Sequence, residues 1–300
     1  MILSTNKLND TCVNLLKEWD LKNGTYDQSD ISKAEILITW PRNVEGLLGK
    51  GLDPKVIQTL SAGVDDLPYS LLSENVKLFS NAGGYSQSVS EHAMALLLAL
   101  AKNVNHRDRP DSYWIQGRTL VLLGGGGIGS TVAKMAKGAF QCKTIGVSRS
   151  FKDPEQFDER VGIDKLEHAI SAADYIVCAL PLTKFTRNLL NYKSLSSAKD
   201  RCVIANVGRA EAINEADITR LLTERPNLRF ATDVFWRTGY TENFDSKLWA
   251  LPNFMGTLHR AGAGANQEVT DLAAEAAARN LKAYLETGKA QNVVDRNDYV

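Results

Sequence analysis

The chain has 300 residues, 44% of them hydrophobic and 23% charged, which is ordinary for a soluble globular protein. Its 35 basic residues equal its 35 acidic residues, and a formal net charge of zero argues against a nucleic acid or an anionic membrane as partner. No apolar run approaches a membrane span, and the N-terminus lacks the basic and apolar regions of a signal peptide. The four cysteines are scattered and form no C-x-x-C motif: Cys12, Cys142, Cys178 and Cys202. We expect them to be buried reduced thiols with no metal site, in a cytoplasmic protein.

Short apolar runs alternate with helix-length stretches in the first 80 residues. We expect strands at residues 1–3, 35–39, 56–60 and 76–79, and the alternation predicts a parallel sheet with helices on both faces. Small-residue loops follow at 61–66 and 81–84, and α/β proteins bind ligands on loops at the carboxyl ends of parallel strands.

A long apolar segment, 89–104, is rich in Ala and Leu. This composition predicts a buried helix that leads into a second domain. The helix could equally lie in a dimer interface, and its sequence favours neither position. A polar stretch, 105–112, follows it.

The second predicted domain opens with an apolar strand at 119–123 that runs directly into four glycines. Gly124, Gly126 and Gly129 fit the pattern G-x-G-x-x-G, in which the glycines permit a tight turn, close approach of a pyrophosphate and close helix packing. The helix that follows offers free N–H groups and a partial positive charge at its N-terminus. The sequence therefore predicts dinucleotide binding.

Five further strands, at 144–147, 175–180, 202–205, 229–232 and 254–257, complete a predicted six-stranded dinucleotide fold. A helix at 214–224 has Asn214 as N-cap and Pro226 as stop. An Ala-rich helix at 267–286 is expected to return to the first domain. We therefore predict an α/β protein with two doubly wound parallel sheets, in which residues 1–86 and 264–300 form a discontinuous substrate domain and residues 87–263 the dinucleotide domain.

The tip of the second strand of this domain carries the signal for the type of cofactor. An acidic residue usually binds the adenosine ribose hydroxyls there, but the chain has Ser148, Arg149 and Ser150. The arginine and the missing carboxylate favour a 2′-phosphate, so we expect NADP(H), with NAD as the weaker alternative. In the competing interpretation Arg149 is a solvated loop residue.

Two side chains at predicted strand ends are candidate catalytic groups. His259 follows an apolar strand and is the histidine best placed for general acid–base catalysis. Arg209 also follows a strand, and small neighbours leave room for its guanidinium to reach a carboxylate or a carbonyl. The other three histidines are expected to be structural or exposed, because they fall in predicted helices or in the polar stretch. They are His92, His106 and His168.

Several motifs follow one another in a characteristic order: SAGVD at 61–65, SVSEH at 88–92, the glycine turn at 124–129, LPLT at 180–183, IANVGR at 204–209, DVF at 233–235 and LH at 258–259. Together they resemble the D-2-hydroxyacid dehydrogenase family, which includes glyoxylate/hydroxypyruvate reductases, over nearly the whole chain. The resemblance implies a Rossmann NAD(P)-binding domain inserted in a flavodoxin-like substrate domain, and a homodimer.

The resemblance also implies roles for individual residues. Arg209 would hold the substrate's carboxylate and keto oxygen, and His259 would protonate the carbonyl oxygen as hydride arrives. Backbone amides of Ala62, Gly63 and Val64 would bind the carboxylate. Separately from the resemblance, the loop positions of Trp40, Tyr85 and Trp236 make them candidates for the pocket wall, with packing in the core as the competing interpretation. The expected cofactor contacts are Gly124, Gly126, Gly127, Ile128, Gly129, Ser148, Arg149, Ser150, Leu180, Pro181, Thr186, Val207, Gly208 and Asp233.

The sequence departs from this family where a glutamate usually lies five residues after the aspartate and hydrogen-bonds the histidine. That position is Thr238. Either Thr238 hydrogen-bonds His259 without charge, or the loop folds so that Glu242 reaches the histidine. We expect the first, because Glu242 is out of register.

These observations predict an NADPH-linked reductase of small 2-oxoacids such as glyoxylate or hydroxypyruvate. One alternative is a catalytically weakened, dinucleotide-sensing binding protein of the same fold, which only the missing glutamate supports. Another is a dehydrogenase of a simple acid such as formate.

Overall fold

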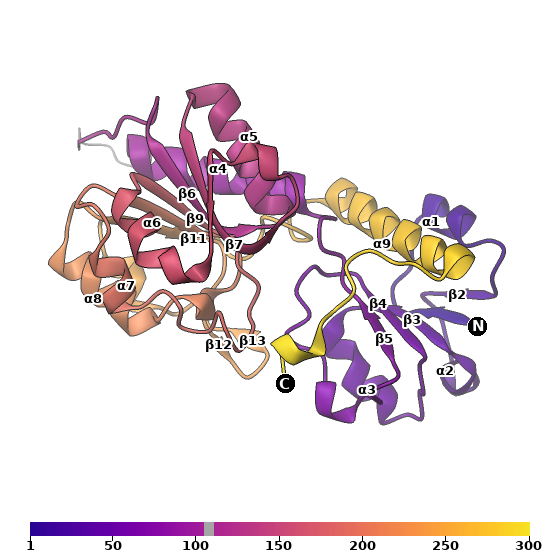
Figure 1. Cartoon of the computed structure of the whole chain (residues 1–300). Helices are drawn as coiled ribbons and strands as arrows, with labels where there is room; N and C mark the ends of the chain where they lie inside the picture. Colours follow the sequence, from indigo (N-terminus) through magenta and orange to yellow (C-terminus); the bar gives the residue numbers. More distant parts are fainter. Residues whose placement is uncertain (105–110) are drawn as a thin grey trace. The chain divides into compact units, whose positions relative to one another are not determined.

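The computed structural model describes residues 1–104 and 111–300 (Figure 1). His106 and most of the polar stretch at 105–112 therefore lie outside the described residues. The chain divides into two compact units, Met1–Tyr85 with Ala265–Val300, and Ser86–Gly264. Each division falls one residue from the expected domain boundary.

The first unit contains a five-stranded parallel sheet in the order β2-β1-β3-β4-β5. This 2-1-3-4-5 order is that of flavodoxin-like folds. The strands are β1 (Ile2–Ser4), β2 (Leu21–Asn23), β3 (Ile36–Thr39), β4 (Val56–Thr59) and β5 (Lys77–Phe79).

Helices cover both faces of this sheet, because successive strand residues point to opposite sides. Ile2 packs in a core cluster with residues of α1 (Asp10–Leu15) and α9 (Gln267–Thr287), which lie together in Figure 1. The next residue, Leu3, packs in a second cluster with α2 (Gln28–Lys33) and α3 (Val44–Leu48). Helix α9 returns the end of the chain to this unit, as the sequence predicted.

The second unit contains a seven-stranded parallel sheet in the order β14-β11-β10-β9-β6-β7-β8. Counted within the unit, this is the 3-2-1-4-5-6 order of the dinucleotide fold with a seventh strand at one edge. The strands are β6 (Thr119–Gly125), β7 (Lys143–Phe151), β8 (Glu159–Val161), β9 (Tyr175–Cys178), β10 (Val203–Asn206), β11 (Arg229–Thr232) and β14 (Phe254–Gly256). The expected fold class is thus confirmed for both units.

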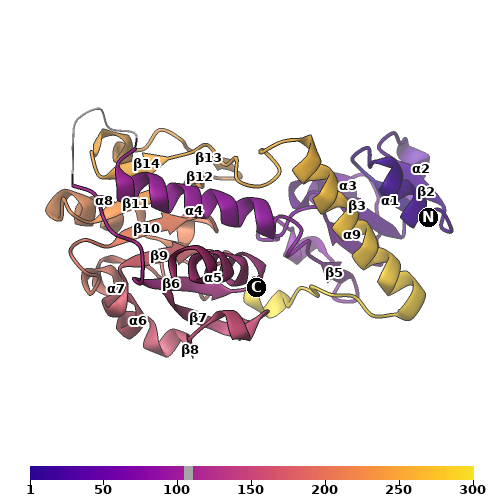
Figure 2. The ribbon, with the colours of Figure 1, turned by 90° about the horizontal axis from the view of Figure 1, so that it is seen from above.

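Two groups of helices sandwich this sheet (Figure 2). One face packs against α6 (Leu166–Ala172), α7 (Tyr192–Ser196) and α8 (Glu215–Glu224) in a single core cluster. On the other, α4 (Ser86–Lys102) and α5 (Gly127–Phe140) pack against each other and the strands. Eight residues of α4 are buried within the chain. Among the described residues, no helix has the length and apolarity needed to cross a membrane.

Three short elements were not predicted: β2, β8 and a hairpin of β12 (Arg237–Thr238) with β13 (Thr241–Glu242). Each strand has two or three residues and carries polar side chains, so periodicity gives no signal for it. Strand β7 is longer than expected and continues through residues 148–150 to Phe151.

Candidate active site

The glycine turn joins β6 to α5 at the carboxyl edge of the second sheet. Gly124 has a φ of +111°, and a Cβ there would lie 2.9 Å from the carbonyl oxygen of Ala179. A Cβ on Gly129 would lie 1.9 Å from the oxygen of Gly124, whereas one on Gly126 would meet nothing within 4 Å. The first and last glycines are therefore required by the turn itself, and the middle one leaves open space above the helix.

The N-terminus of α5 can accept the phosphates of a dinucleotide. Its N-cap, Gly126, provides no side-chain hydrogen bond. Among the described residues, the N–H groups of Gly127, Ile128 and Gly129 donate to no other group. Free donors at the positive end of a helix form an anion site, so these residues fit the expected cofactor.

The tip of β7 carries Ser148, Arg149 and Ser150. Ser148 is half-buried, and the other two residues are exposed. The guanidinium carbon of Arg149 lies 6.0 Å from the ring centre of Phe185, and the ammonium of Lys184 lies 5.5 Å from the same ring. Two cations thus approach one exposed aromatic ring. Sequence reasoning missed Lys184 and Phe185, whose only signal is that they directly follow the LPLT motif at 180–183.

The loop after β9 contains Leu180, Pro181 and Thr186. The Thr186 hydroxyl donates to the Pro181 carbonyl at 2.6 Å and accepts from the Thr183 amide at 2.8 Å, so it closes the loop on itself. A Cβ on Gly208 would lie 2.4 Å from the Leu180 carbonyl, which shows how closely the next loop approaches.

Arg209 follows β10 on a loop that the Asn206 side chain holds in place. Asn206 accepts from the Gly208 amide at 3.2 Å and donates to the Arg209 carbonyl at 3.1 Å. The Val207 amide donates to the Cys178 carbonyl of β9 at 2.9 Å. The half-buried Arg209 therefore extends from a fixed backbone.

Asp233, at the end of β11, anchors the loop that carries His259. Its buried carboxylate accepts from the Thr257 hydroxyl at 2.6 Å and from the amides of Arg260 and Ala261 at 3.0 and 2.9 Å. Its carbonyl accepts from the His259 amide at 2.7 Å. This aspartate was expected near the nicotinamide; its contacts in the chain are to the histidine loop.

His92 joins the same network from α4. Its Nε2 lies 2.8 Å from the Thr257 hydroxyl and 3.4 Å from an oxygen of Asp233. The connecting helix thus contacts the histidine loop through a polar side chain.

The partner of His259 is Glu242, and the expectation that Thr238 takes this place is wrong. The Nδ1 of His259 lies 2.6 Å from Glu242 Oε2, and the Phe235 amide donates to Glu242 Oε1 at 2.8 Å. Thr238 is exposed on the β12–β13 hairpin. A two-residue turn there folds the chain back and sets Glu242 beside Arg237 in the ladder. Linear register therefore misled the prediction, and the alternative in which the loop brings Glu242 to the histidine is the one observed.

Glu242 is held as a carboxylate. Burial would raise the pKa of Glu242, but the hydrogen bond and charge of His259, the Phe235 amide and the charge of Arg209 outweigh it and lower that pKa. The Glu242 side chain is 17% exposed and that of His259 is 47% exposed. The second ring nitrogen of His259, Nε2, bonds to no other described group.

In the first unit, the loop after β4 presents Ala62, Gly63 and Val64. Their amides donate to no other described group. The Ser61 hydroxyl donates to the Gly63 carbonyl at 2.6 Å and the Tyr69 hydroxyl to the Val64 carbonyl at 3.0 Å, so two of the three carbonyls are engaged. This arrangement suits a carboxylate.

A pocket of about 240 Å³ lies in the first unit and includes two predicted substrate residues, Trp40 and Tyr85. The Tyr85 hydroxyl donates to the Leu60 carbonyl at 3.1 Å, and burial raises the pKa of Tyr85 to about 12. Trp236 does not line this pocket. Its indole donates to the Ile213 carbonyl at 2.7 Å and packs against the core of the second unit.

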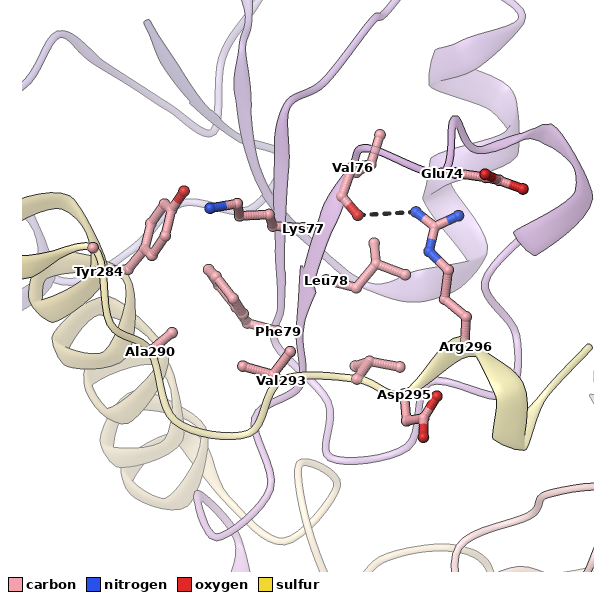
Figure 3. Close-up of a pocket in the computed structure, with 12 residues that line it drawn as sticks. Glu74, Val76, Lys77, Leu78, Phe79, Tyr284, Ala290, Val293, Asp295 and Arg296 are labelled. Atoms are coloured by element: carbon pink, nitrogen blue, oxygen red, sulfur yellow. Dashed lines mark hydrogen bonds between the residues drawn. The ribbon is translucent and has the colours of Figure 1, made fainter.

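A larger hollow of about 500 Å³ lies beside β5, the end of α9 and the C-terminal segment (Figure 3). Its cations are engaged: Lys77 lies 5.0 Å from the Tyr284 ring centre, and Arg296 donates to the Val76 carbonyl at 2.9 Å. No predicted site residue lines it.

Comparison with known proteins adds independent findings. Residues 79–261 match the sequence model of the D-isomer specific 2-hydroxyacid dehydrogenase, NAD binding domain. The chain is 28% identical over 225 residues to a hydroxypyruvate reductase of Thermotoga maritima, covering 71% of this chain and 72% of that one. It is 27% identical to a D-3-phosphoglycerate dehydrogenase of Methanocaldococcus jannaschii over 98% of its own length, but spans only 59% of that longer protein.

A solved structure from Pyrobaculum aerophilum, provisionally described as a formate dehydrogenase, is similar over the whole chain. It superposes with a TM-score of 0.84 and 31% identity over 99% of both chains.

Proposed function

Because the chain belongs to the D-isomer specific 2-hydroxyacid dehydrogenase family, with its NAD-binding domain, we propose that it reduces small 2-oxoacids such as glyoxylate or hydroxypyruvate with NADPH. The observation that carries this proposal is the His259–Glu242 pair. It gives the chain a charged acid–base dyad on a strand-end loop of the sheet that also bears Arg209 and the glycine turn.

Reduction of a carbonyl builds negative charge on its oxygen. Arg209 orients the substrate and stabilises this charge, and His259 donates a proton from Nε2 to the oxygen. The bound nicotinamide supplies the hydride. Glu242 hydrogen-bonds Nδ1 of the imidazole and so fixes the orientation of the ring.

The amides of Ala62, Gly63 and Val64 bind the substrate carboxylate. Their free donors support this role. Backbone amides are neutral, so they bind the carboxylate without a second cation that would compete with Arg209 for the keto oxygen. The pocket that contains Trp40 and Tyr85 receives the rest of the substrate.

The preference for NADPH rests on the tip of β7. Residues 148–151 include no acid, and Arg149 lies with Lys184 about the Phe185 ring. We propose that Arg149 pairs with the 2′-phosphate and that Ser148 and Ser150 hydrogen-bond to it, since two nearby cations favour a dianion.

The alternative of a dinucleotide-sensing protein without catalysis loses its only support. It depended on the missing glutamate, and Glu242 contacts the histidine instead. A sensor has no need for a carboxylate–histidine pair at the nicotinamide end.

A substrate panel tests the proposal. Oxidation of NADPH and of NADH is followed by absorbance with glyoxylate, hydroxypyruvate and pyruvate, and reduction of NADP⁺ with formate. We expect turnover of at least one 2-oxoacid and a higher kcat/KM with NADPH. Turnover of formate alone would identify a formate dehydrogenase, and tight NADPH binding without any turnover would restore the sensor.

We also propose that the protein is a cytoplasmic homodimer. All four cysteines are free and buried, as expected of thiols kept reduced. Light scattering after gel filtration should give a mass of about 66 kDa, twice the 33.0 kDa of one chain.

A further inference from the structure

A partly buried ion pair joins the two segments that carry the catalytic side chains. Arg237 Nε lies 2.6 Å from Glu211 Oε1, and the side chains are only 14% and 12% exposed. Glu211 lies two residues after Arg209, in the turn Ala210–Ala212. Arg237 lies in β12, directly opposite Glu242 in the hairpin.

A second hydrogen bond joins the same segments at the adjacent position. The Trp236 indole donates to the Ile213 carbonyl at 2.7 Å. Two attachments side by side fix the orientation of the hairpin as well as its distance from the Arg209 loop. The Asn243 amide, which donates to the Trp236 carbonyl at 2.9 Å, closes the hairpin itself.

Stability alone does not explain the pair. Removing two charges from most of their water carries a desolvation penalty, and apolar replacements of similar size are often as stable or more stable. Glu211 Oε2 is also buried and has no hydrogen-bond partner among the described residues. A pair that leaves one of its own oxygens unsatisfied is better explained by the geometry that it imposes.

We propose that Arg237 and Glu211 are positioning residues that hold the hairpin so that Glu242 stays on His259. Arg209 and the acid–base dyad are thereby tied into one unit through Glu211, Arg237 and the β12–β13 ladder. This inference rests on the proposed function where it is tested by the pH profile of 2-oxoacid reduction. The second test, by ¹⁵N spectroscopy of His259, does not require any turnover.

Several charged groups among the described residues act on the dyad or on its loop. Glu242 contacts His259 directly, and Arg209 acts on Glu242 through its charge. Asp233 accepts from the amide of Arg260 next to the histidine. Arg237 and Glu211 carry opposite charges, so their joint removal leaves the net charge near the dyad unchanged. A shift in pH dependence then reports a change in the position of Glu242 relative to His259.

The test is the double variant Arg237→Met with Glu211→Leu, which keeps volume and net charge. If the pair positions Glu242, the alkaline limb of the pH profile of kcat/KM for 2-oxoacid reduction moves to lower pH by roughly half to one unit, because the Glu242 carboxylate no longer lies against Nδ1 of His259. In a Glu242→Gln background the same double variant adds no further shift. The matched control is Arg220→Met with Glu224→Leu, an Arg–Glu pair at 2.7 Å on the exposed face of α8, which should leave the profile unchanged.

A readout without turnover separates this inference from the proposed function. With ¹⁵N-labelled histidine, the His259 signals at one alkaline pH report the tautomer with Nδ1 protonated, which hydrogen-bonding to Glu242 favours. The double variant should lose that bias as Glu242→Gln does, even if no 2-oxoacid is turned over.

An unchanged pH limb together with an unchanged ¹⁵N spectrum would overturn the proposal, as would a pH shift that adds fully to that of Glu242→Gln. Circular dichroism measures folding of each variant. If the Met/Leu variant unfolds, the variant Arg237→Gln with Glu211→Leu, which also keeps the net charge and in which no such pair can form, provides the same comparison.

Discussion

At the scale of single residues, His259 combines a constrained backbone with a polarised ring. Its φ of +48° lies in the left-handed region, which costs a residue other than glycine about 1 kcal/mol or more. The Asp233 contacts to the neighbouring amides offset this cost. The backbone holds the loop, and Glu242 holds the ring.

The exchange Glu242→Gln should move the alkaline limb of 2-oxoacid reduction to lower pH. The carboxylate that contacts Nδ1 of His259 is lost from the dyad, and with it the negative charge beside the proton donor. We expect a shift of roughly one pH unit, measured as kcat/KM against pH. Thr238→Glu is the control: it adds a carboxylate on the exposed side of the hairpin, so the limb should stay in place. An upward extension by Thr238→Glu would show that Thr238 faces the histidine after all.

The same carboxylate predicts a pH dependence of stability. The pKa of Glu242 is lowered in the folded state, so its contribution is present above its unfolded value of about 4.3 and is lost as pH falls through the folded pKa. The difference in unfolding free energy between the wild type and Glu242→Gln should therefore be largest near neutral pH and shrink in acid. Urea unfolding from pH 3 to pH 7 measures it; a difference that grows in acid contradicts the assignment.

At the scale of elements, the β12–β13 hairpin decides which side chain reaches the histidine. Gly239 has a φ of +63° in a two-residue turn, whereas Tyr240 has no positive φ. This pattern is that of a type II′ turn, which matches the twist of the flanking strands. Glu242 reaches His259 because this turn reverses the chain.

Gly239→Ala should therefore reduce activity through strain alone. No atom would meet the added Cβ within 4 Å, but a positive φ costs alanine roughly 1–2 kcal/mol. We expect kcat/KM to fall roughly three- to tenfold as the hairpin relaxes. Gly288→Ala, at φ +73° after α9 and also with open space, is the matched control and should lower the melting temperature without changing kcat/KM. Equal losses of activity in both variants would contradict the role of the hairpin.

The extended tip of β7 predicts the cofactor preference. The double exchange Ser148→Asp with Arg149→Ala places a carboxylate where a ribose hydroxyl would bind and removes a cation. A charged hydrogen bond is worth about 1.5–3 kcal/mol, so the NADPH-to-NADH ratio of kcat/KM should fall by roughly tenfold to a hundredfold. A wild type that prefers NADH, or a ratio that the double exchange leaves unchanged, would refute this use of the strand tip.

The buried strands and their order in the chain were predictable, because short apolar runs of three to six residues alternate with helix-length segments and are bounded by small or polar loops. The Asn214 cap is confirmed, since its side chain accepts from the Asp217 amide at 3.1 Å. The edge strands β2 and β8 were not predictable, because their side chains alternate without a clear apolar face. The hairpin was missed because TGYT resembles a loop, and its consequence for Glu242 depends on a turn type that sequence spacing does not reveal.

At the scale of the whole molecule, the proposed chemistry is divided between the two units. The glycine turn, Arg209 and the His259–Glu242 pair belong to the second unit. The free amides of residues 62–64 belong to the first. In the proposed function, the first unit carries the amides that would bind the carboxylate, and the second carries the glycine turn for the cofactor and the proton donor.

The most direct test of the account compares the wild type with His259→Asn in NADPH oxidation with glyoxylate and hydroxypyruvate. The account predicts turnover by the wild type and a loss of roughly 10²- to 10⁴-fold in kcat for the variant, with NADPH affinity by fluorescence titration unchanged. A variant that retains the wild-type rate, or a wild type that turns over no 2-oxoacid, would contradict it.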